Sequence, residues 1–192
     1  LIVGDSIGEG TGAVEEDNKW FNRLNKLLKD KYKSVVFSYQ ITKGGSASFD
    51  GLIEFLNSFK KDDIDMVFIC FGQNDQGQLT KTQFPVIYEA LVRKIINEYP
   101  NAEIASIIES SIGKNPYQQA IRDIAQHYNL VILDTRTVFE NSGIDYDELA
   151  PDGTHPNDKG QELYANLFLE EITKRVDGDY KIPTRNTIKP LN

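Results

Sequence analysis

Short apolar runs alternate with amphipathic stretches along the chain, and this alternation predicts its secondary structure. Five runs are apolar at nearly every position, as expected for strands that are buried on both faces. They cover residues 1–3, 35–37, 65–71, 104–108 and 130–133.

The stretches between these runs repeat apolar residues every three or four positions, which predicts helices with one buried face. Four of them lie within residues 20–28, 52–56, 87–99 and 121–128. A fifth helix is expected to begin near Asn157, to run through Ile172 and to stop before Gly178. Asn115 and Pro116 supply a cap and a favoured first-turn proline for the fourth helix.

Doubly buried strands that alternate with helices indicate a parallel sheet covered on both faces. Because the crossovers between parallel strands are right-handed, we predict an α/β fold, a three-layer α/β/α sandwich. Ligands of such sheets bind beyond the carboxyl ends of the strands. Each residue that directly follows a strand is therefore a candidate site residue.

The length of 192 residues allows one substantial α/β domain. We expect this domain to span residues 1–176, because residues 177–192 lack periodicity and contain two prolines. We interpret residues 177–192 as a C-terminal tail on the surface or a linker. The sequence contains no internal repeat and no low-complexity tract.

The composition, 40% hydrophobic and 26% charged, is that of a folded globular protein. A formal net charge of −8 argues against nucleic acid as a partner, since a protein surface that binds nucleic acid is basic. No apolar stretch approaches the roughly 18 residues of a membrane-spanning helix. A small-molecule or saccharide ester remains compatible with this charge, and the oligomeric state is left open.

Two local features bear on stability and cellular location. Cys70 is the single cysteine and lies in an apolar run, so we expect a buried thiol rather than a disulfide or a nucleophile. The chain begins at Leu1 inside an apolar run, and we expect upstream residues to be missing from this sequence. Localisation is therefore left open, and secretion stays among the alternatives.

The first candidate for chemistry is Ser6, which closes Gly4-Asp5-Ser6 directly after the first strand. A serine in this position lies at the carboxyl edge of the sheet, where its hydroxyl can face a ligand. Glycines before and after it allow a tight turn and close backbone approach. The alternative for this tripeptide alone is a serine that caps a helix or turn.

The second candidate is the pair Asp152 and His155, in a turn-rich loop before the last helix. Gly153 and Pro156 restrict this loop, so the carboxylate can reach an imidazole nitrogen. Such a pair orients a histidine that accepts a serine proton. A turn-forming aspartate beside a surface histidine is the alternative, and His127, the other histidine, falls in a helix and is interpreted as structural.

Two further blocks offer hydrogen-bond donors at strand ends. Asn74 follows the third strand in Gly-Gln-Asn-Asp, and its amide is expected to point into the same crevice as Ser6. Gly44 and Gly45 follow the second strand, where a backbone N–H can approach an anionic oxygen. With the Ser6 N–H, these groups would make three donors for the oxyanion of a tetrahedral intermediate. Taken singly, each block is an ordinary turn.

Together the four blocks resemble those of the SGNH (GDSL) hydrolases, and the resemblance extends from Leu1 to about Ile172. It implies a flavodoxin-like sheet with strand order 2-1-3-4-5, without a cofactor or metal. It implies Ser6 as nucleophile with Asp152 and His155 as its charge partners. It implies an oxyanion hole formed by the N–H of Ser6, Gly45 and Asn74.

This sequence departs from the family pattern in two places. Gln73 precedes Asn74 where Thr or Gly is commoner, so a side-chain amide is expected to narrow or rewire the pocket. Thr42 and Lys43 stand where an Asn often precedes the glycines of the second block. We choose Gly45 as the donor because residues 46–48 then lead into the helix as in the family, with Gly44 as the alternative.

The function that follows is a serine esterase that hydrolyses carboxylic esters through an acyl-serine intermediate. Short acetyl-type acyl groups are favoured, because no long apolar loop indicates a lipase lid. One alternative is an acyltransferase that uses the same triad to acylate a sugar hydroxyl, and another is a non-catalytic carbohydrate-binding module. The acyl group and alcohol are not specified by the loops 9–18, 76–81 and 109–115.

Two other loops, at residues 8–13 and 109–111, have less specific patterns. Residues 8–13 formally fit the glycine pattern of dinucleotide-binding loops, but they do not open a helix directly after the first strand. Glu9 would also place a negative charge where pyrophosphate lies. Glu109, Ser110 and Ser111 follow the fourth strand, and we interpret them as a solvent-facing loop, with a pocket lining as the alternative.

Overall fold

The computed structural model describes residues 1–58, 63–178, 181–182 and 189–191, without the side chains of 55–58. Its centre is a five-stranded parallel sheet with the order β2-β1-β3-β4-β5. The strands are β1 (Ile2–Gly4), β2 (Gln40–Thr42), β3 (Met66–Cys70), β4 (Glu103–Ile108) and β5 (Val131–Asp134). This arrangement confirms the predicted fold class and strand order.

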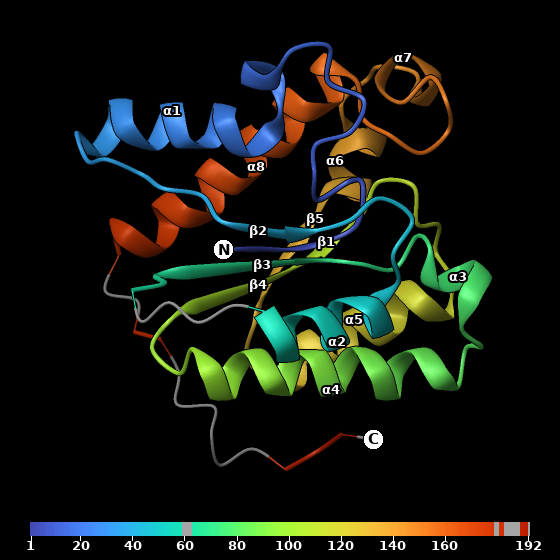
Figure 1. Cartoon of the computed structure of the whole chain (residues 1–192). Coiled ribbons are helices and arrows are strands. Elements are labelled where there is room, and N and C mark those ends of the chain that lie inside the picture. Colours follow the sequence, from blue (N-terminus) through green and yellow to red (C-terminus); the bar gives the residue numbers. More distant parts are fainter. Residues whose placement is uncertain (59–62, 179–180, 183–188, 192) are drawn as a thin grey trace.

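Helices cover both faces of the sheet, which gives the three layers seen in Figure 1. One face carries α1 (Trp20–Tyr32), α6 (Thr135–Asn141) and α8 (Asp158–Val176). The other carries α2 (Ser48–Ser58), α4 (Gln83–Glu98) and α5 (Pro116–His127). The short elements η1 (Glu16–Asn18), α3 (Asp75–Gln78) and α7 (Tyr146–Leu149) lie in the connections.

Two hydrophobic cores, one on each face, hold the layers together. On the α1/α8 face, the ring of Trp20 packs edge-on against Phe68 and Phe168 at centroid distances of 5.4 and 5.0 Å. On the other face, α4 and α5 bury Tyr88 and Ile121 against the sheet. Burying a side chain of this size stabilises the fold by about 1.5–3 kcal/mol. The apolar helix faces predicted from the sequence are therefore the ones that stabilise the α/β/α sandwich.

The helix caps follow the sequence. The Asn115 side chain accepts the N–H of Tyr117 and of Gln118, and Pro116 opens α5. Asn157 caps α8 in the same way, which places the start of that helix where the sequence predicts it. These caps satisfy N–H groups that the helix itself leaves without partners.

The strand predicted at residues 35–37 is wrong. Val35 and Phe37 are 71% and 75% exposed and belong to no strand. The edge strand β2 lies further along, where Ile41 pairs with Val3 and is 9% exposed. The edge strand β2 buries only one apolar residue, Ile41, so its sequence gives a weak strand pattern. The nearby run 35–37 is more apolar and therefore predicted the strand in the wrong place.

The proposed division into a domain of residues 1–176 and a tail or linker of 177–192 stays a prediction, and most of the second segment lies outside the described residues. The last main helix ends at Val176. The Leu191 N–H donates to Glu89 on α4 at 2.6 Å, and His127 on α5 bonds the Lys189 carbonyl. The described helices include none that is long and apolar enough to cross a membrane.

Candidate active site

Ser6 lies in a tight turn at the carboxyl end of β1, and two glycines permit this turn. A Cβ on Gly4 would come within 2.8 Å of the Cys70 carbonyl oxygen, and one on Gly8 within 3.3 Å of the Asp5 carbonyl oxygen. The turn is closed by the Glu9 N–H, which donates to the Asp5 carbonyl at 3.0 Å. The half-buried Ser6 side chain is thus held at the sheet edge.

The loop that carries Asp152 and His155 is folded by local hydrogen bonds. Gly153 adopts a φ of 78°, a left-handed conformation that favours glycine, and its N–H donates to the Ala150 carbonyl at 2.9 Å. The Asp152 Oδ1 atom accepts the N–H of Thr154 at 2.9 Å and of His155 at 2.7 Å. This aspartate therefore shapes the loop as well as facing the imidazole.

The three side chains form a continuous hydrogen-bonded line. Ser6 Oγ lies 2.9 Å from His155 Nε2, and His155 Nδ1 lies 2.6 Å from Asp152 Oδ2. Desolvation would raise the pKa of Asp152, but the hydrogen bonds from His155 and Thr154 outweigh it and lower the pKa to about 2. Asp152 is thus an anion at neutral pH, which suits a carboxylate that fixes the histidine tautomer.

The backbone N–H groups of Ser6 and of the glycine pair after β2 are the candidates for binding an oxyanion. Within the described chain, no acceptor takes the N–H of Ser6, Gly44 or Gly45. A Cβ added to Gly44 would lie 3.7 Å from the Ser6 Cβ, which places this glycine beside the candidate nucleophile. Gly45 has a φ of 78°, and a Cβ there would meet no atom within 4 Å.

Asn74 lies beside the residues that neighbour Ser6 and Gly45, but its side-chain amide already has hydrogen-bond partners. The Asn74 Nδ2 atom donates to Asp5 Oδ2 at 2.9 Å and to the Ser46 carbonyl at 3.0 Å. An oxyanion must therefore share one of these N–H groups or displace the Ser46 carbonyl. The two bonds also fix the amide in the orientation in which nitrogen, not oxygen, faces the site.

Gln73, the unusual residue before Asn74, is part of a chain of side-chain amides. Its Oε1 accepts from Gln76 Nε2 at 3.2 Å, and Gln76 Oε1 accepts from Asn115 Nδ2 at 2.6 Å. This chain joins the turn after β3 to the cap of α5. The side chain thus contributes to a network between two loops of the candidate site, and its effect on the pocket stays a prediction.

Three buried carboxyl groups next to the site were not given a role by the sequence. Asp75 Oδ1 accepts both the N–H and the hydroxyl of Ser48, at 3.0 and 2.6 Å, and so ties the second block to the third. Asp5 and Glu109 are both 0% exposed. The interpretation of Glu109 and Ser110 as solvent-facing is wrong, since both are fully buried. Asp5 and Asp75 stand inside the Gly-Asp-Ser and Asn-Asp motifs, which was the available signal.

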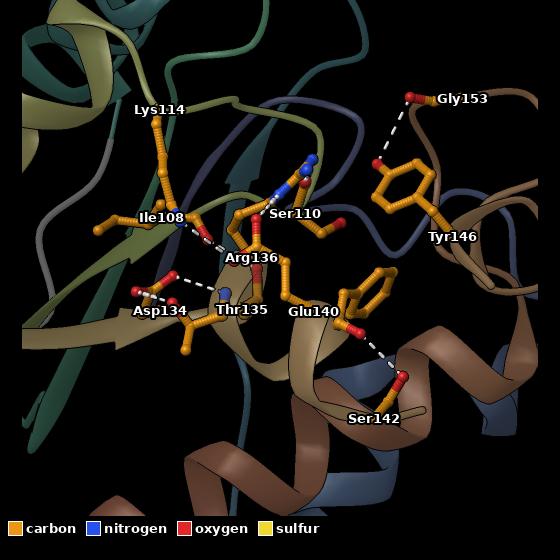
Figure 2. Close-up of polar contacts among 12 residues, drawn as sticks. Ile108, Ser110, Lys114, Asp134, Thr135, Arg136, Glu140, Ser142, Tyr146 and Gly153 are labelled. Carbon is orange, nitrogen blue, oxygen red and sulfur yellow. Dashed lines mark hydrogen bonds and ion pairs between the residues drawn. The ribbon is translucent and has the colours of Figure 1, made fainter. Parts of the chain in front are cut away.

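The loop of Asp152 and His155 is connected through α7 and α6 to the segment that follows β4 (Figure 2). The Tyr146 hydroxyl points to the Gly153 carbonyl at 3.5 Å, and the Arg136 guanidinium lies 5.4 Å from the centre of the Tyr146 ring. Arg136 also donates to the Ser110 carbonyl at 3.1 Å and pairs with Glu140 at 2.9 Å. Strand end, helix and histidine loop are thereby connected.

The fold and these contacts define a hydrolase-type α/β/α domain with a serine, a histidine and an aspartate in line at the sheet edge. Residues 2–163 match the model of the GDSL-like lipase/acylhydrolase family. The chain therefore belongs to this family of lipases and acylhydrolases. The resemblance drawn from the four sequence blocks is confirmed.

Solved structures agree with this assignment. A two-domain esterase (CEX) active on acetylated mannans is 25% identical, with a TM-score of 0.79, and the match covers 100% of this chain and 53% of that one. The chain thus spans about half the length of that esterase. The acetylxylan esterase Axe2 from Geobacillus stearothermophilus is 22% identical, with 90% and 92% coverage and a TM-score of 0.70, and shares the fold.

A GDSL-like lipase from Parabacteroides merdae also shares the fold, at 17% identity, a TM-score of 0.71 and coverage of 88% and 93%. A search of curated protein sequences gives no significant match.

Proposed function

We propose that this domain is a serine esterase that removes short acyl groups, acetyl above all, through an acyl-enzyme on Ser6. The observation that carries the proposal is the line from Ser6 Oγ to His155 Nε2 at 2.9 Å and from His155 Nδ1 to Asp152 Oδ2 at 2.6 Å. A serine hydroxyl needs a base within this reach to become a nucleophile.

In the proposed reaction, His155 Nε2 takes the Ser6 proton as Oγ attacks the ester carbonyl carbon. The resulting imidazolium is stabilised by Asp152 and gives its proton to the departing alcohol. Water then attacks the acyl-serine carbonyl while His155 accepts its proton. As the bond from the acyl carbon to Oγ breaks, His155 returns this proton to Ser6 Oγ, and the carboxylic acid leaves. The low pKa of Asp152 keeps its charge in place throughout.

The oxyanion is proposed to be held by the N–H groups of Ser6 and Gly45 and by the Asn74 amide. The free backbone N–H groups at Ser6 and Gly45 support this role, and Gly44 remains the alternative to Gly45. Asn74 would act through a three-centre bond, in which the N–H aimed at the Ser46 carbonyl is shared with the oxyanion. Donors fixed in advance stabilise the transition state without reorganising.

Replacing Asn74 by alanine is expected to lower kcat by roughly 10²–10³-fold, as is usual when one oxyanion donor is removed. The reason is that the amide is aimed at charge that develops only in the transition state, so KM should change little. Steady-state kinetics with p-nitrophenyl acetate measures both constants. Gln119→Ala is the control and should leave kcat unchanged, because Gln119 is an exposed amide on α5 that bonds Asp123 Oδ1 at 2.7 Å. An unchanged kcat in Asn74→Ala would remove this residue from the oxyanion hole.

The preference for acetyl groups has two supports. The 25% identical esterase is active on acetylated mannans. The candidate site is also open and polar, since Gly44, Gly45 and Asp152 are exposed. A long acyl chain would find little apolar surface at these positions, whereas an acetyl group needs little.

A chain-length series of p-nitrophenyl esters, run beside acetylated mannan and acetylated xylan, tests the proposal. We expect kcat/KM to be highest for acetate and to fall as the acyl chain grows, with acetate released from at least one polysaccharide. A maximum at long chains would contradict the acetyl preference. Adding deacetylated saccharide as an acceptor separates the alternatives, because an acyltransferase would move acetyl to the sugar faster than to water.

A further inference from the structure

Beneath the candidate nucleophile lies a group of three buried side chains that the charge line through His155 does not use. Asp5 follows β1, Cys70 ends β3 and Glu109 follows β4, and each is 0% exposed. Their ligand-type atoms all lie within 4.8 Å of one another. Burying two carboxyl groups this close together is costly unless each is hydrogen-bonded and their charge is reduced.

Each carboxyl group binds a different part of the candidate oxyanion hole. Asp5 Oδ1 accepts the N–H of Ile7 at 2.8 Å, in the Ser6 turn, while Asp5 Oδ2 accepts from Asn74 Nδ2 at 2.9 Å. Glu109 Oε2 accepts the N–H of Gln73 at 2.7 Å. The Asp5 carboxyl thus holds the turn after β1 and the Asn74 side chain. The Glu109 carboxyl holds the backbone at Gln73, one residue before Asn74.

Within this buried group, the carboxyl groups of Asp5 and Glu109 each offer an oxygen that lies within 4.8 Å of the other's. Two carboxyl groups can bond only when one of them carries a proton. Burial raises the pKa of both groups, that of Asp5 to about 6 and that of Glu109 well above its usual range. Asp5 accepts N–H groups from Ile7 and Asn74 whereas Glu109 accepts one, from Gln73, so these contacts favour the anion on Asp5 and the proton on Glu109.

The same three side chains would be near enough to hold a metal ion, but their contacts favour the proton. Asp5 Oδ1, Asp5 Oδ2 and Glu109 Oε2 each already accept an N–H. The Cys70 Sγ atom donates to Glu109 Oε1 at 3.3 Å, and burial raises the pKa of this thiol, which keeps it protonated. A thiolate ligand is thus disfavoured here.

We propose that Asp5 and Glu109 form a proton-sharing carboxyl pair that positions the Asn74 amide relative to the Ser6 turn. Both are positioning residues for the oxyanion hole, and the inference rests on the proposed function. The shared proton has two consequences. It ties the turns after β1 and β3 to each other, and it limits the pair to a single negative charge beside the place where the oxyanion forms.

The experiment is a double-mutant cycle between Glu109 and Asn74, using Glu109→Ala, Asn74→Ala and the double variant of the whole chain. With p-nitrophenyl acetate, we expect Glu109→Ala to lower kcat by roughly 10–100-fold at nearly constant KM, less than the loss from removing the oxyanion donor itself. Because Glu109 acts through Asn74, the double variant should be no slower than Asn74→Ala alone, within a factor of about 2. Losses that multiply would overturn the proposal.

Two further variants separate positioning from general stability. In Glu109→Gln, the amide can still accept the Gln73 N–H and donate to Asp5, so it should restore most of the kcat lost in Glu109→Ala. Glu103→Ala removes another buried carboxyl from the opposite end of β4, where it faces Arg175. This control should lower the thermal unfolding midpoint and leave kcat unchanged. A slow Glu109→Gln, or an equal loss of kcat in Glu103→Ala, would contradict the positioning role.

If Glu109→Ala does not fold, Asp5→Asn carries the same test. An asparagine at this position has one oxygen and cannot accept from both Ile7 and Asn74, so kcat should fall, again without a further loss when Asn74→Ala is added. Multiplying losses in this second cycle would overturn the proposal. Ser6→Ala separates a failure of the proposed function from a failure of the carboxyl-pair proposal. If Ser6→Ala still turns over ester, the esterase mechanism is refuted. If Ser6→Ala is inactive but the losses in the double-mutant cycles multiply, the carboxyl pair alone is refuted.

Discussion

Ser6→Ala is expected to reduce ester turnover by roughly 10⁴-fold or more, because the acyl-enzyme has no other place to form. The fold should survive, since the Ser6 side chain is half-buried and, among the described residues, its hydroxyl bonds only His155. Turnover of p-nitrophenyl acetate and labelling by a fluorophosphonate probe measure the loss.

The matched control for that variant is Ser38→Ala, which removes an exposed serine bonded to Asn25. It should keep both turnover and labelling. Near-normal activity in Ser6→Ala would exclude Ser6 as nucleophile, whatever the geometry around it.

His155→Ala is expected to have an effect of similar size, roughly 10⁴-fold in kcat, because nucleophile and base act as one unit. With the imidazole gone, no base lies within hydrogen-bonding reach of Ser6 Oγ in the described part of the chain. Combining His155→Ala with Ser6→Ala should add little to either loss, since each change alone disables the same step.

The chain contains its own control for this experiment. His127, the only other histidine, lies on α5 and bonds the Lys189 carbonyl. His127→Ala should leave kcat unchanged. If both histidine variants were equally slow, or if His155→Ala were active, the proposed base would be wrong.

The parts of the site that could be predicted are those fixed by topology. Once the strands are recognised as parallel, Ser6 and Asn74 must lie at one edge of the sheet, although 68 positions separate them in the sequence. His155 could be paired with Asp152 because a short loop restricted by glycine and proline leaves few arrangements. The contact between Ser6 and His155, across 149 positions, follows from the two placements together.

The remaining features depend on contacts that a linear pattern does not encode. Glu109 follows an apolar strand as the start of a polar loop would, and its burial depends on the Gln73 N–H and the Cys70 thiol, which come from the end of another strand. The occupied amide of Asn74 is equally hidden, because the Ser46 carbonyl that it binds belongs to another block. The misplaced second strand shows the same limit, since Phe37 is apolar yet exposed, and pairing with Val3 selects Ile41 instead.

The central claim is that acyl transfer passes through a covalent ester on Ser6. Rapid mixing with p-nitrophenyl acetate, acid quenching and mass spectrometry of the digested chain test it directly. We expect an acetyl group on the peptide that contains Ser6, formed before steady-state turnover and absent in Ser6→Ala. Two results would contradict the claim. One is rapid release of p-nitrophenol without any acetylated peptide, and the other is an acetyl group on a different residue that turnover requires.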